Sequence, residues 1–254
     1  MKVTFLGTGT SQGVPVIACR CEVCISTDSR DKRLRCAVHV EWENASVVID
    51  TGPDFRQQML RAQINNVDAV LYTHEHKDHL AGLDDVRAYN FHSKKHMDVY
   101  ASEIVEEAIR REFAYIFAAD KYPGIPLLNI HRIENKSFEL LGKKIIPIEV
   151  IHYLLPVFGF RIDNFAYITD AKSISETEAS KLKGVHTLVI NALRKETHNS
   201  HFTLNEALQF IEIVKPKQAY LTHLSHQMGT HEEVEAHLPQ NVKIAFDGLS
   251  VLIS

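Results

Sequence analysis

The 254-residue sequence has no long hydrophobic run, and none of its segments approaches the ~20 consecutive apolar residues that a membrane-spanning helix needs. The first six residues, Met1 to Leu6, lead directly to Gly7, so the apolar core of a secretory signal is also missing. We therefore expect a cytoplasmic protein with no membrane partner.

Positive charge is scarce as well. Lys and Arg together number 28 against 32 Asp and Glu, which gives a formal net charge of -4. Proteins that bind nucleic acid usually carry a basic surface, because contacts from Lys and Arg to phosphates supply much of the affinity. This balance argues against a nucleic-acid partner and favours a small-molecule substrate.

Only four cysteines are present, and three of them lie in one short stretch, Cys19 to Cys24. Clustered thiols cannot join distant parts of the chain as a disulfide framework does, so metal binding is the favoured interpretation. A redox pair and buried apolar thiols are the alternatives, and the isolated Cys36 is expected in the core. Histidine is abundant, and its 15 residues offer the imidazole ligands of zinc, manganese and iron sites.

The hydrophobic pattern alternates between strands and helices, with no low-complexity linker and no internal repeat. It predicts one α/β domain of stacked layers over residues 1–254. No helical pattern interrupts the loop that carries the cysteines. The expected strands cover residues 2–6, 37–42, 46–50, 68–73, 99–101, 144–151, 159–162, 165–169, 187–192, 218–222, 243–246 and 250–253. The expected helices cover residues 53–62, 80–89, 103–118, 175–182, 203–214 and 230–237.

The segment from Phe91 to Ile133 is rich in Phe and Tyr. Two interpretations are open: an insertion that covers one end of the molecule, or an ordinary packed helix with its flanking chain. As an insertion it would admit a nucleobase, close as a lid or form the interface of a homodimer. The sequence does not choose among these roles.

The strongest signal for chemistry is the stretch H-E-H-K-D-H at residues 74–79, which follows an expected buried strand. Three imidazoles and a carboxylate within six residues surround one small volume if the backbone turns sharply after the strand. These are ligand types of divalent metal ions. The alternative is a set of polar residues at a solvated strand end.

Three further metal-type residues stand where expected strands end, namely His152, Asp170 and His223. Proteins of the α/β class place ligands at the carboxyl ends of strands. With the earlier stretch these residues make seven donors, which is more than one tetrahedral ion needs. The number therefore points to two metal ions that share a carboxylate.

With these residues in place, the chain resembles the metallo-β-lactamase superfamily over nearly its whole length, since H-x-H-x-D-H is the signature of that superfamily. The resemblance implies an αββα sandwich of two mixed sheets with helices on the outer faces. It also implies two divalent ions, Zn²⁺ or Mn²⁺. One ion would be held by His74, His76 and His152, the other by Asp78, His79 and His223, with Asp170 as the bridge. True lactamases differ, because their second site typically uses a Cys and lacks the bridging Asp.

A closer resemblance is to the phosphoribosyl cyclic phosphodiesterases of bacterial phosphonate breakdown, the PhnP type. It rests on the Cys-x-Cys-x-x-Cys loop, on the stretch Leu221 to Gln227 and on Phe246-Asp247-Gly248. The resemblance implies a structural Zn²⁺ held by Cys19, Cys21, Cys24 and His226. Such a donor set closes a tetrahedron with no open position, so its role would be to pin the early loop beside the active site.

Two residues are expected to carry catalysis, Asp78 and His201. By resemblance, His201 sits over the substrate and either protonates the leaving oxygen or stabilises the phosphoryl charge. Its alternative role is to cap the helix that begins at Thr203, and the nearby His198 is a candidate assistant. Asp78 would both bind metal and orient the attacking hydroxide, which the two ions generate near neutral pH.

The predicted function is hydrolysis of a small cyclic phosphodiester, either phosphoribosyl 1,2-cyclic phosphate or a nucleoside 2′,3′-cyclic phosphate. The first alternative is a transfer-RNA 3′-processing endonuclease, which uses the same seven ligands but needs to bind a large polyanion. Hydrolysis of thioesters or lactones is a second alternative, because metal hydroxide also attacks carbonyl groups. A non-catalytic metal-binding protein that kept the fold is a third.

Overall fold

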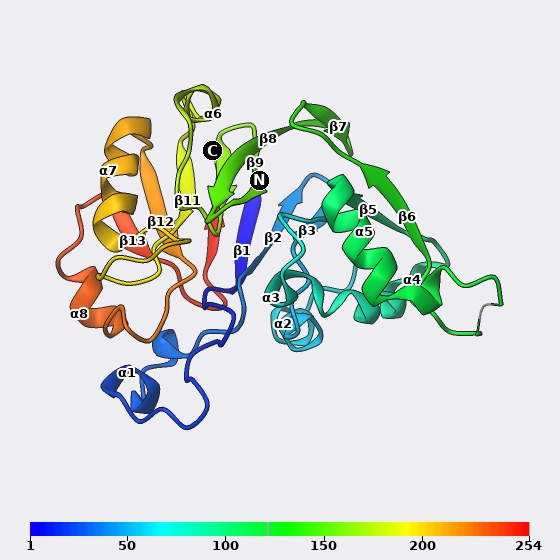
Figure 1. The fold of residues 1–254 in the computed structure, drawn as a ribbon, viewed down its shortest axis with the longest axis horizontal. Coiled ribbons are helices and arrows are strands. Elements are labelled where there is room, and N and C mark those ends of the chain that lie inside the picture. Colours follow the sequence, from blue (N-terminus) through cyan, green and yellow to red (C-terminus); the bar gives the residue numbers. More distant parts are fainter. Residues whose placement is uncertain (121, 254) are drawn as a thin grey trace.

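The computed structural model describes residues 1–120 and 122–253, which form a layered α/β sandwich (Figure 1). Two seven-stranded mixed sheets pack face to face through a central hydrophobic core. The outer face of the first sheet is covered by helices α2 (Phe55–Ala62), α4 (Arg87–Ser93) and α5 (Glu103–Glu112). The outer face of the second is covered by α6 (Glu176–Ser180), α7 (Leu204–Val214) and α8 (His231–Glu235). The αββα arrangement predicted from the sequence is confirmed.

The first sheet has the strand order β14-β1-β2-β3-β4-β5-β6. Its strands are β1 (Lys2–Gly7), β2 (Ala37–Trp42), β3 (Ala45–Ile49), β4 (Ala69–Leu71), β5 (Met97–Ala101), β6 (Leu128–Arg132) and β14 (Ser250–Leu252). Strands β3 to β6 are parallel, whereas β1 pairs antiparallel with both β2 and β14. The two ends of the chain therefore lie side by side (Figure 1).

The second sheet has the strand order β13-β12-β11-β10-β9-β8-β7. Its strands are β7 (Phe138–Leu140), β8 (Lys143–His152), β9 (Leu155–Ile162), β10 (Phe165–Ile168), β11 (Thr187–Asn191), β12 (Gln218–Thr222) and β13 (Val242–Ile244). Strands β10 to β13 are parallel. The residues that follow β10 and β12 therefore meet at one edge of the sheet, and these include Asp170 and His223.

Alternate residues of each strand face opposite sides of its sheet, which explains why separate cores form between and outside the sheets. In β3, Val47 and Ile49 face the central core, whereas Val48 faces the helices of the first sheet. In β10, Phe165 and Tyr167 face the same central core. The strands that lead to the candidate ligands are therefore held rigidly from both faces.

The structure differs from the sequence expectations in the cysteine loop and in two additional strands. The loop that carries the cysteines contains a short helix, α1 (Glu22–Ile25), which lies at the lower left of Figure 1. Four residues make barely one helical turn, which is too short to show a periodic pattern of apolar residues in the sequence. Of the two open interpretations of Phe91–Ile133, the described residues of this segment favour ordinary packing, because they include β5, α5 and β6, which extend and cover the first sheet. Strands β6 and β7 were also not expected.

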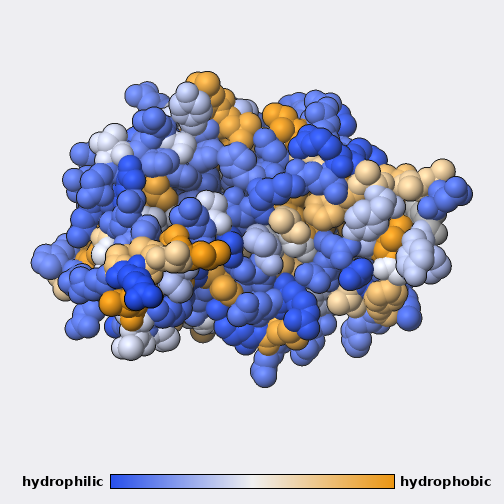
Figure 2. Space-filling model, turned by 60° about the horizontal axis from the view of Figure 1, so that its bottom comes forward, coloured by the Kyte–Doolittle hydropathy of each residue, from blue (hydrophilic) through white to orange (hydrophobic). Residues whose placement is uncertain are grey.

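Most large apolar side chains are taken up by the three large cores. On the face shown in Figure 2, hydrophobic residues lie in small separate patches within a largely hydrophilic surface. Among the helices in the described part of the chain, none combines the length and the apolar character that a membrane span requires.

Candidate metal centres

The H-x-H-x-D-H stretch leaves β4 and turns at once into the short helix α3 (Lys77–Leu80). This turn packs directly on Gly52, where a Cβ atom would lie 2.0 Å from the backbone oxygen of Asp78. Only glycine allows two backbones to approach so closely. The sharp turn that the ligand spacing requires is therefore built against the chain that follows β3.

The first predicted ligand group is brought together at this turn. His74 Nε2 lies 3.0 Å from His76 Nδ1, and the His152 ring packs against both imidazoles with centroid distances of 5.8 and 5.1 Å. The Nδ1 atoms of His74 and His152, which point away from the group, make hydrogen bonds to neighbouring residues. His74 Nδ1 lies 2.9 Å from Thr73 Oγ1, and His152 Nδ1 donates to the Ser200 carbonyl oxygen at 2.8 Å. These hydrogen bonds leave each Nε2 lone pair facing the group.

The second predicted group gathers around Asp170. His79 Nε2 lies 3.3 Å from Asp78 Oδ2 and 3.2 Å from Asp170 Oδ2. On the other side, His223 Nε2 lies 3.3 Å from Asp170 Oδ1. Donor atoms of Asp170 also lie within 4.8 Å of those of His74 and of His152, which belong to the first group, so Asp170 borders both groups, as a bridging carboxylate must.

The strand ends beside the cluster have left-handed backbones, with φ of 67° at Asp50 and 56° at both Asp170 and His223. Residues other than glycine rarely adopt this backbone conformation, and it persists only where the surrounding structure stabilises it. Asn191 holds the turn after Asp170, because its side chain accepts from Ala171 N at 2.8 Å and donates to Ala171 O at 3.0 Å. The ligand turns are therefore fixed by the fold.

Asp50 is a site residue that the interpretation of the sequence missed. It is buried at the end of β3, and its Oδ2 accepts hydrogen bonds from His79 Nδ1 at 2.7 Å and from Thr73 Oγ1 at 2.8 Å. A carboxylate of this kind orients a metal-binding histidine and fixes its tautomer. The signal that could have found it is the one used for the ligands, an acidic residue at the end of a buried strand.

Burial and mutual charge set the protonation of the cluster. Burial by itself would lower the pKa of His79, but Asp78, Asp170 and Asp50 together hold that pKa well above its usual value. Burial lowers the pKa of His74 well below its usual value, and the His79 charge adds to this. Burial opposes ionisation of Asp170, yet the imidazoles around it hold its pKa well below the usual range. The cluster thus combines carboxylates with imidazoles and attracts cations.

The donor atoms fit divalent metal ions. His79 Nε2 is buried without a hydrogen-bond partner among the described residues. Metal bonds of about 2.0–2.2 Å place neighbouring nitrogen and oxygen ligands about 3.0–3.5 Å apart. The separations around His79, Asp170 and His223, 3.2 to 3.3 Å, lie within that range. A cation also removes the repulsion between the facing lone pairs of His74 and His76.

His201 lies against the same cluster. Its Nδ1 is buried, has no hydrogen-bond partner among the described residues and lies 3.6 Å from Asp170 Oδ1. Its ring packs against His152 and His223 with centroid distances of 4.6 and 4.9 Å. Burial lowers the pKa of His201 to about 3, and Asp170 opposes this only in part.

The helix that follows His201, α7, is capped by Thr203 and not by His201. Thr203 Oγ1 accepts from Glu206 N at 3.2 Å, and the Glu206 carboxylate accepts from Thr203 N at 2.7 Å, which is a capping box. The capping alternative for His201 is therefore wrong. His198 packs beside His201 at a centroid distance of 5.1 Å, with its Nδ1 3.2 Å from Ser200 Oγ.

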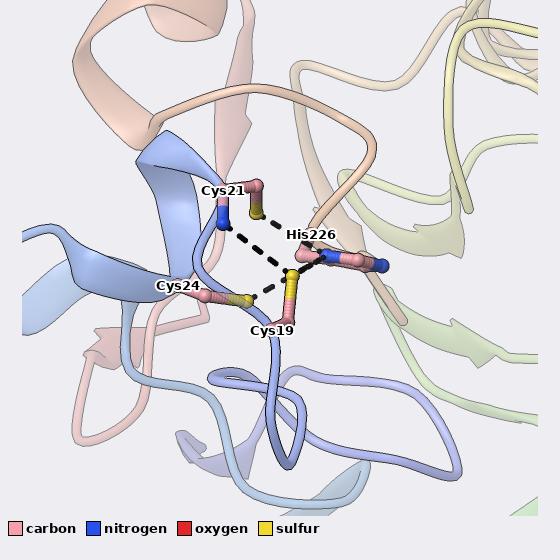
Figure 3. A group of neighbouring side chains, drawn as sticks. All are labelled: Cys19, Cys21, Cys24 and His226. Carbon is pink, nitrogen blue, oxygen red and sulfur yellow. Dashed lines mark hydrogen bonds between the residues drawn. The ribbon is translucent and has the colours of Figure 1, made fainter.

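Cys19, Cys21 and Cys24 converge on His226 (Figure 3). His226 Nδ1 lies 3.3 Å from the sulfurs of Cys19 and Cys21 and 3.6 Å from that of Cys24. In a tetrahedral zinc site the bonds are about 2.3 Å to sulfur and about 2.0 Å to nitrogen, so sulfur and nitrogen stand about 3.5 Å apart. Val16 N donates to Cys24 Sγ at 3.3 Å and supports this arrangement. The four side chains fit a zinc ion closely.

A pocket of about 480 Å³ adjoins the His and Asp residues around Asp170, the proposed dinuclear cluster, and falls in the size range of small-molecule sites. It is lined by His76, His152, Tyr153, Leu154, Leu155, Asn199 and Ser200. A larger hollow of about 1000 Å³ lies between α2 and α4 on the outer face, and none of the candidate ligands lines it.

Residues 45–224 match the model of the β-lactamase superfamily domain. The chain belongs to the β-lactamase superfamily. The matched range contains the H-x-H-x-D-H stretch together with His152, Asp170 and His223, whereas the cysteine loop and His226 lie outside it. The metallo-β-lactamase fold of this superfamily implies a hydrolase that binds divalent metal.

Solved structures narrow the family further. A structure described as a new diphosphatase from the PhnP family is 41% identical, with a TM-score of 0.92, and the match covers 98% of this chain and 96% of that one. At this identity and coverage the chain is a member of the PhnP family, as its motifs suggested. Human tRNase Z, short form, is 20% identical with a TM-score of 0.73 over 100% of both chains, which establishes the shared fold alone.

One curated relative is an octanoyltransferase from Porphyromonas gingivalis, 39% identical over 256 residues. The match covers 100% of this chain but 52% of the relative. The chain thus spans about half the length of the curated relative that it matches.

Proposed function

We propose that this protein is a metal-dependent phosphodiesterase that hydrolyses a small cyclic phosphodiester. The observation that carries the proposal is the position of His201, which lies against the cluster centred on Asp170, beside a pocket of about 480 Å³. An arrangement of donors around one small volume suits a reaction in which charge builds on a phosphoryl group. The candidate substrates are phosphoribosyl 1,2-cyclic phosphate and nucleoside 2′,3′-cyclic phosphates.

Two divalent ions, Zn²⁺ or Mn²⁺, would be held by the residues that converge on Asp170. The proposed ligands are His74, His76 and His152 for one ion, Asp78, His79 and His223 for the other, and Asp170 for both. When bound, the ions supply a hydroxide nucleophile near neutral pH and neutralise phosphoryl charge. The protein orients the ligands beforehand through the hydrogen bonds at their opposite nitrogens, such as that from His79 to Asp50.

His201 would act on the substrate from the other side of the site. Its unpaired Nδ1 faces the volume next to Asp170, where the phosphoryl group would lie. Because burial lowers its pKa to about 3, the neutral ring would donate a hydrogen bond that stabilises the phosphoryl charge, and protonation of the leaving oxygen would require the charge of the substrate to raise that pKa. Asp78 would both help to hold a metal ion and orient the nucleophile.

Cys19, Cys21, Cys24 and His226 would hold one structural Zn²⁺. All four donors are protein side chains, so no position is left open for a substrate. His226 lies three residues after His223, and this ion would therefore tie the early loop to the strand end that carries an active-site ligand.

Attack on phosphorus is favoured over attack on carbon by the PhnP-family relative, whose description names a diphosphatase. Hydrolysis of a small diphosphate is accordingly the second candidate. The octanoyltransferase name belongs to a protein of about twice the matched length, so it does not by itself assign acyl transfer to this chain. The net charge of -4 disfavours transfer-RNA processing.

Phosphorus NMR of the Zn²⁺- or Mn²⁺-loaded protein tests the proposal. The substrates are 5-phosphoribosyl 1,2-cyclic phosphate, a nucleoside 2′,3′-cyclic phosphate and a dinucleoside diphosphate, with an octanoyl thioester assayed separately. We expect ring opening of a cyclic phosphate, lost on chelation and restored by metal. The His201→Ala variant should reduce turnover about 10² to 10⁴-fold while keeping its metal content.

Other outcomes redirect or overturn the proposal. Cleavage of the diphosphate alone would assign the second candidate, and cleavage of the thioester alone would reject phosphoester chemistry. Turnover of precursor transfer RNA in preference to the cyclic phosphates would restore the endonuclease. Full metal sites with no turnover of any of these substrates would favour a non-catalytic protein.

A further inference from the structure

The turn between β8 and β9 is made by two residues, Tyr153 and Leu154, and the flanking pair His152 and Leu155 is in register. Tyr153 has a left-handed backbone with φ of 57°. Two-residue hairpin turns normally place Gly, Asn or Asp at such a position, because larger side chains are strained there. Tyrosine is therefore a poor choice for forming the turn itself.

The side chains of this turn contribute little to any core. Tyr153 is 61% exposed and Leu154 is 79% exposed. No hydrogen bond of the Tyr153 hydroxyl is present among the described residues. A strained backbone that presents an aromatic ring to solvent is unfavourable for the fold, and strain of this kind collects at functional sites.

Both residues line the pocket that adjoins the dinuclear cluster, next to His76 and His152. Asn199 and Ser200 line the same pocket. Ser200 is held by His152 Nδ1 through its carbonyl oxygen at 2.8 Å and by His198 through its hydroxyl at 3.2 Å. Asn199 is exposed beside this anchored residue, and its amide makes no hydrogen bond among the described residues.

We infer that Tyr153 and Asn199 form a subsite for a planar heteroaromatic ring, so that the substrate is a phosphoester that carries a nucleobase. The inference rests on the proposed function, because it assigns the organic part of the same substrate. The Tyr153 ring stacks on the face of the base, and the Asn199 amide, with its donors and acceptor, binds the edge. Among the candidate substrates this favours a nucleoside 2′,3′-cyclic phosphate over the base-free phosphoribosyl compound.

The test compares Tyr153→Gly with the matched control Tyr153→Phe on two substrates, adenosine 2′,3′-cyclic phosphate and 5-phosphoribosyl 1,2-cyclic phosphate. Glycine removes the ring and relieves the left-handed strain, so this variant should melt at the same temperature as the wild type or higher. We expect kcat/KM for the adenosine substrate to fall about tenfold through KM, with the base-free substrate unchanged. Tyr153→Phe should keep the wild-type preference, and Asn199→Ala should weaken it.

A binding measurement keeps this inference separate from the proposed function. Saturation-transfer difference NMR reports whether the ring protons of adenosine 5′-monophosphate contact the metal-loaded protein, and it needs no turnover. We expect a strong ring signal with the wild type and Tyr153→Phe and a weak one with Tyr153→Gly. An undiminished ring signal with Tyr153→Gly, or equal loss of kcat/KM for both substrates, overturns the subsite. Failure of hydrolysis alone would reject only the proposed function.

Discussion

The two clusters of metal-type side chains in this molecule are built in opposite ways. The cysteine cluster is mostly local, with three donors between Cys19 and Cys24 and one, His226, from a distant loop. The dinuclear cluster is assembled from residues at the ends of β4, β8, β10 and β12, strands that are distant in sequence and belong to both sheets. The first offers four donors, whereas the second borders a pocket that its own residues line and a further histidine.

The ligand residues of the two clusters also differ in backbone conformation. Asp170 and His223 have left-handed backbones, whereas in the cysteine loop the left-handed residue is Ala18, next to Cys19, and not one of the four cluster residues. Buried nitrogens without hydrogen-bond partners likewise include those of His79 and His201 at the dinuclear cluster. A cluster that only stabilises can relax to an unstrained geometry. A cluster that performs chemistry must be held in place by the surrounding fold.

Replacing Asp170, the proposed bridging carboxylate, should show most clearly that the two clusters have different roles. Asp170→Asn leaves a poorer ligand between the two histidine groups, so we expect kcat/KM to fall about 10³-fold or more. Metal analysis should find the dinuclear ions lost and one zinc retained. Asp163→Asn is the matched control, because Asp163 is also left-handed but is paired with Lys143 away from the site. Loss of all metal from Asp170→Asn would contradict the independence of the clusters.

The converse change is Cys24→Ser. It removes a donor from the closed cluster, and we expect the free energy of unfolding to fall by about 3 kcal/mol as the structural zinc is lost. Urea unfolding with metal analysis measures both quantities. Cys36→Ser is the control, since Cys36 is buried against Tyr167 and Thr222 and has no place in the cluster. Equal destabilisation by both variants would remove the case for a zinc role.

Asp50→Asn changes a residue that orients a proposed metal ligand, His79, and leaves the ligand itself in place. The amide cannot hold His79 Nδ1 as a carboxylate does, so we expect a loss of about 10- to 100-fold in metal affinity or kcat/KM. Zinc in the cysteine cluster should be unaffected. Steady-state kinetics across a metal titration give the answer, and unchanged values would show that Asp50 serves only the fold.

His39 gives a pH dependence that is independent of both clusters. Burial lowers the pKa of His39 from 6.5 to about 4, against a weaker opposing effect of Glu41. The unfolded chain therefore binds more protons than the folded one between these values, and stability falls as pH falls. From pH 7 to pH 5 we expect this residue to account for a loss of about 2 kcal/mol.

Urea unfolding of the wild type and His39→Gln at both pH values isolates the effect. Glutamine cannot be protonated and can still bond Ser46, which lies 2.7 Å from His39 Nε2. The variant should lose less stability on acidification than the wild type does. An identical loss in both proteins would assign acid sensitivity to the ligand clusters instead.

Much of the dinuclear site could be predicted from the sequence, because its residues follow a local rule. His74, His152, Asp170 and His223 each stand at the end of a recognisable strand, and the rule needs no knowledge of how the strands pair. Asp50 obeys the same rule at the end of β3, but the sequence pattern places it only as the last residue of the expected strand 46–50, so it was missed. Strand β6 was also not predicted, because its residues are only partly buried and their alternation of apolar and polar side chains is weak.

By itself, the sequence determined the α/β class and the spacing of the metal-type residues, since these depend on residue type and short-range periodicity, while the resemblance of its motifs to a family supplied the proposed donor sets. Only the tertiary structure decided that Asp170 lies between two histidine groups, that Asp50 supports His79 and that Tyr153 stands at the pocket. The reason is that strand register, close contacts such as that of Gly52 with Asp78, and left-handed turns arise from contacts between residues far apart in the chain. Such contacts leave no periodic trace in the local sequence.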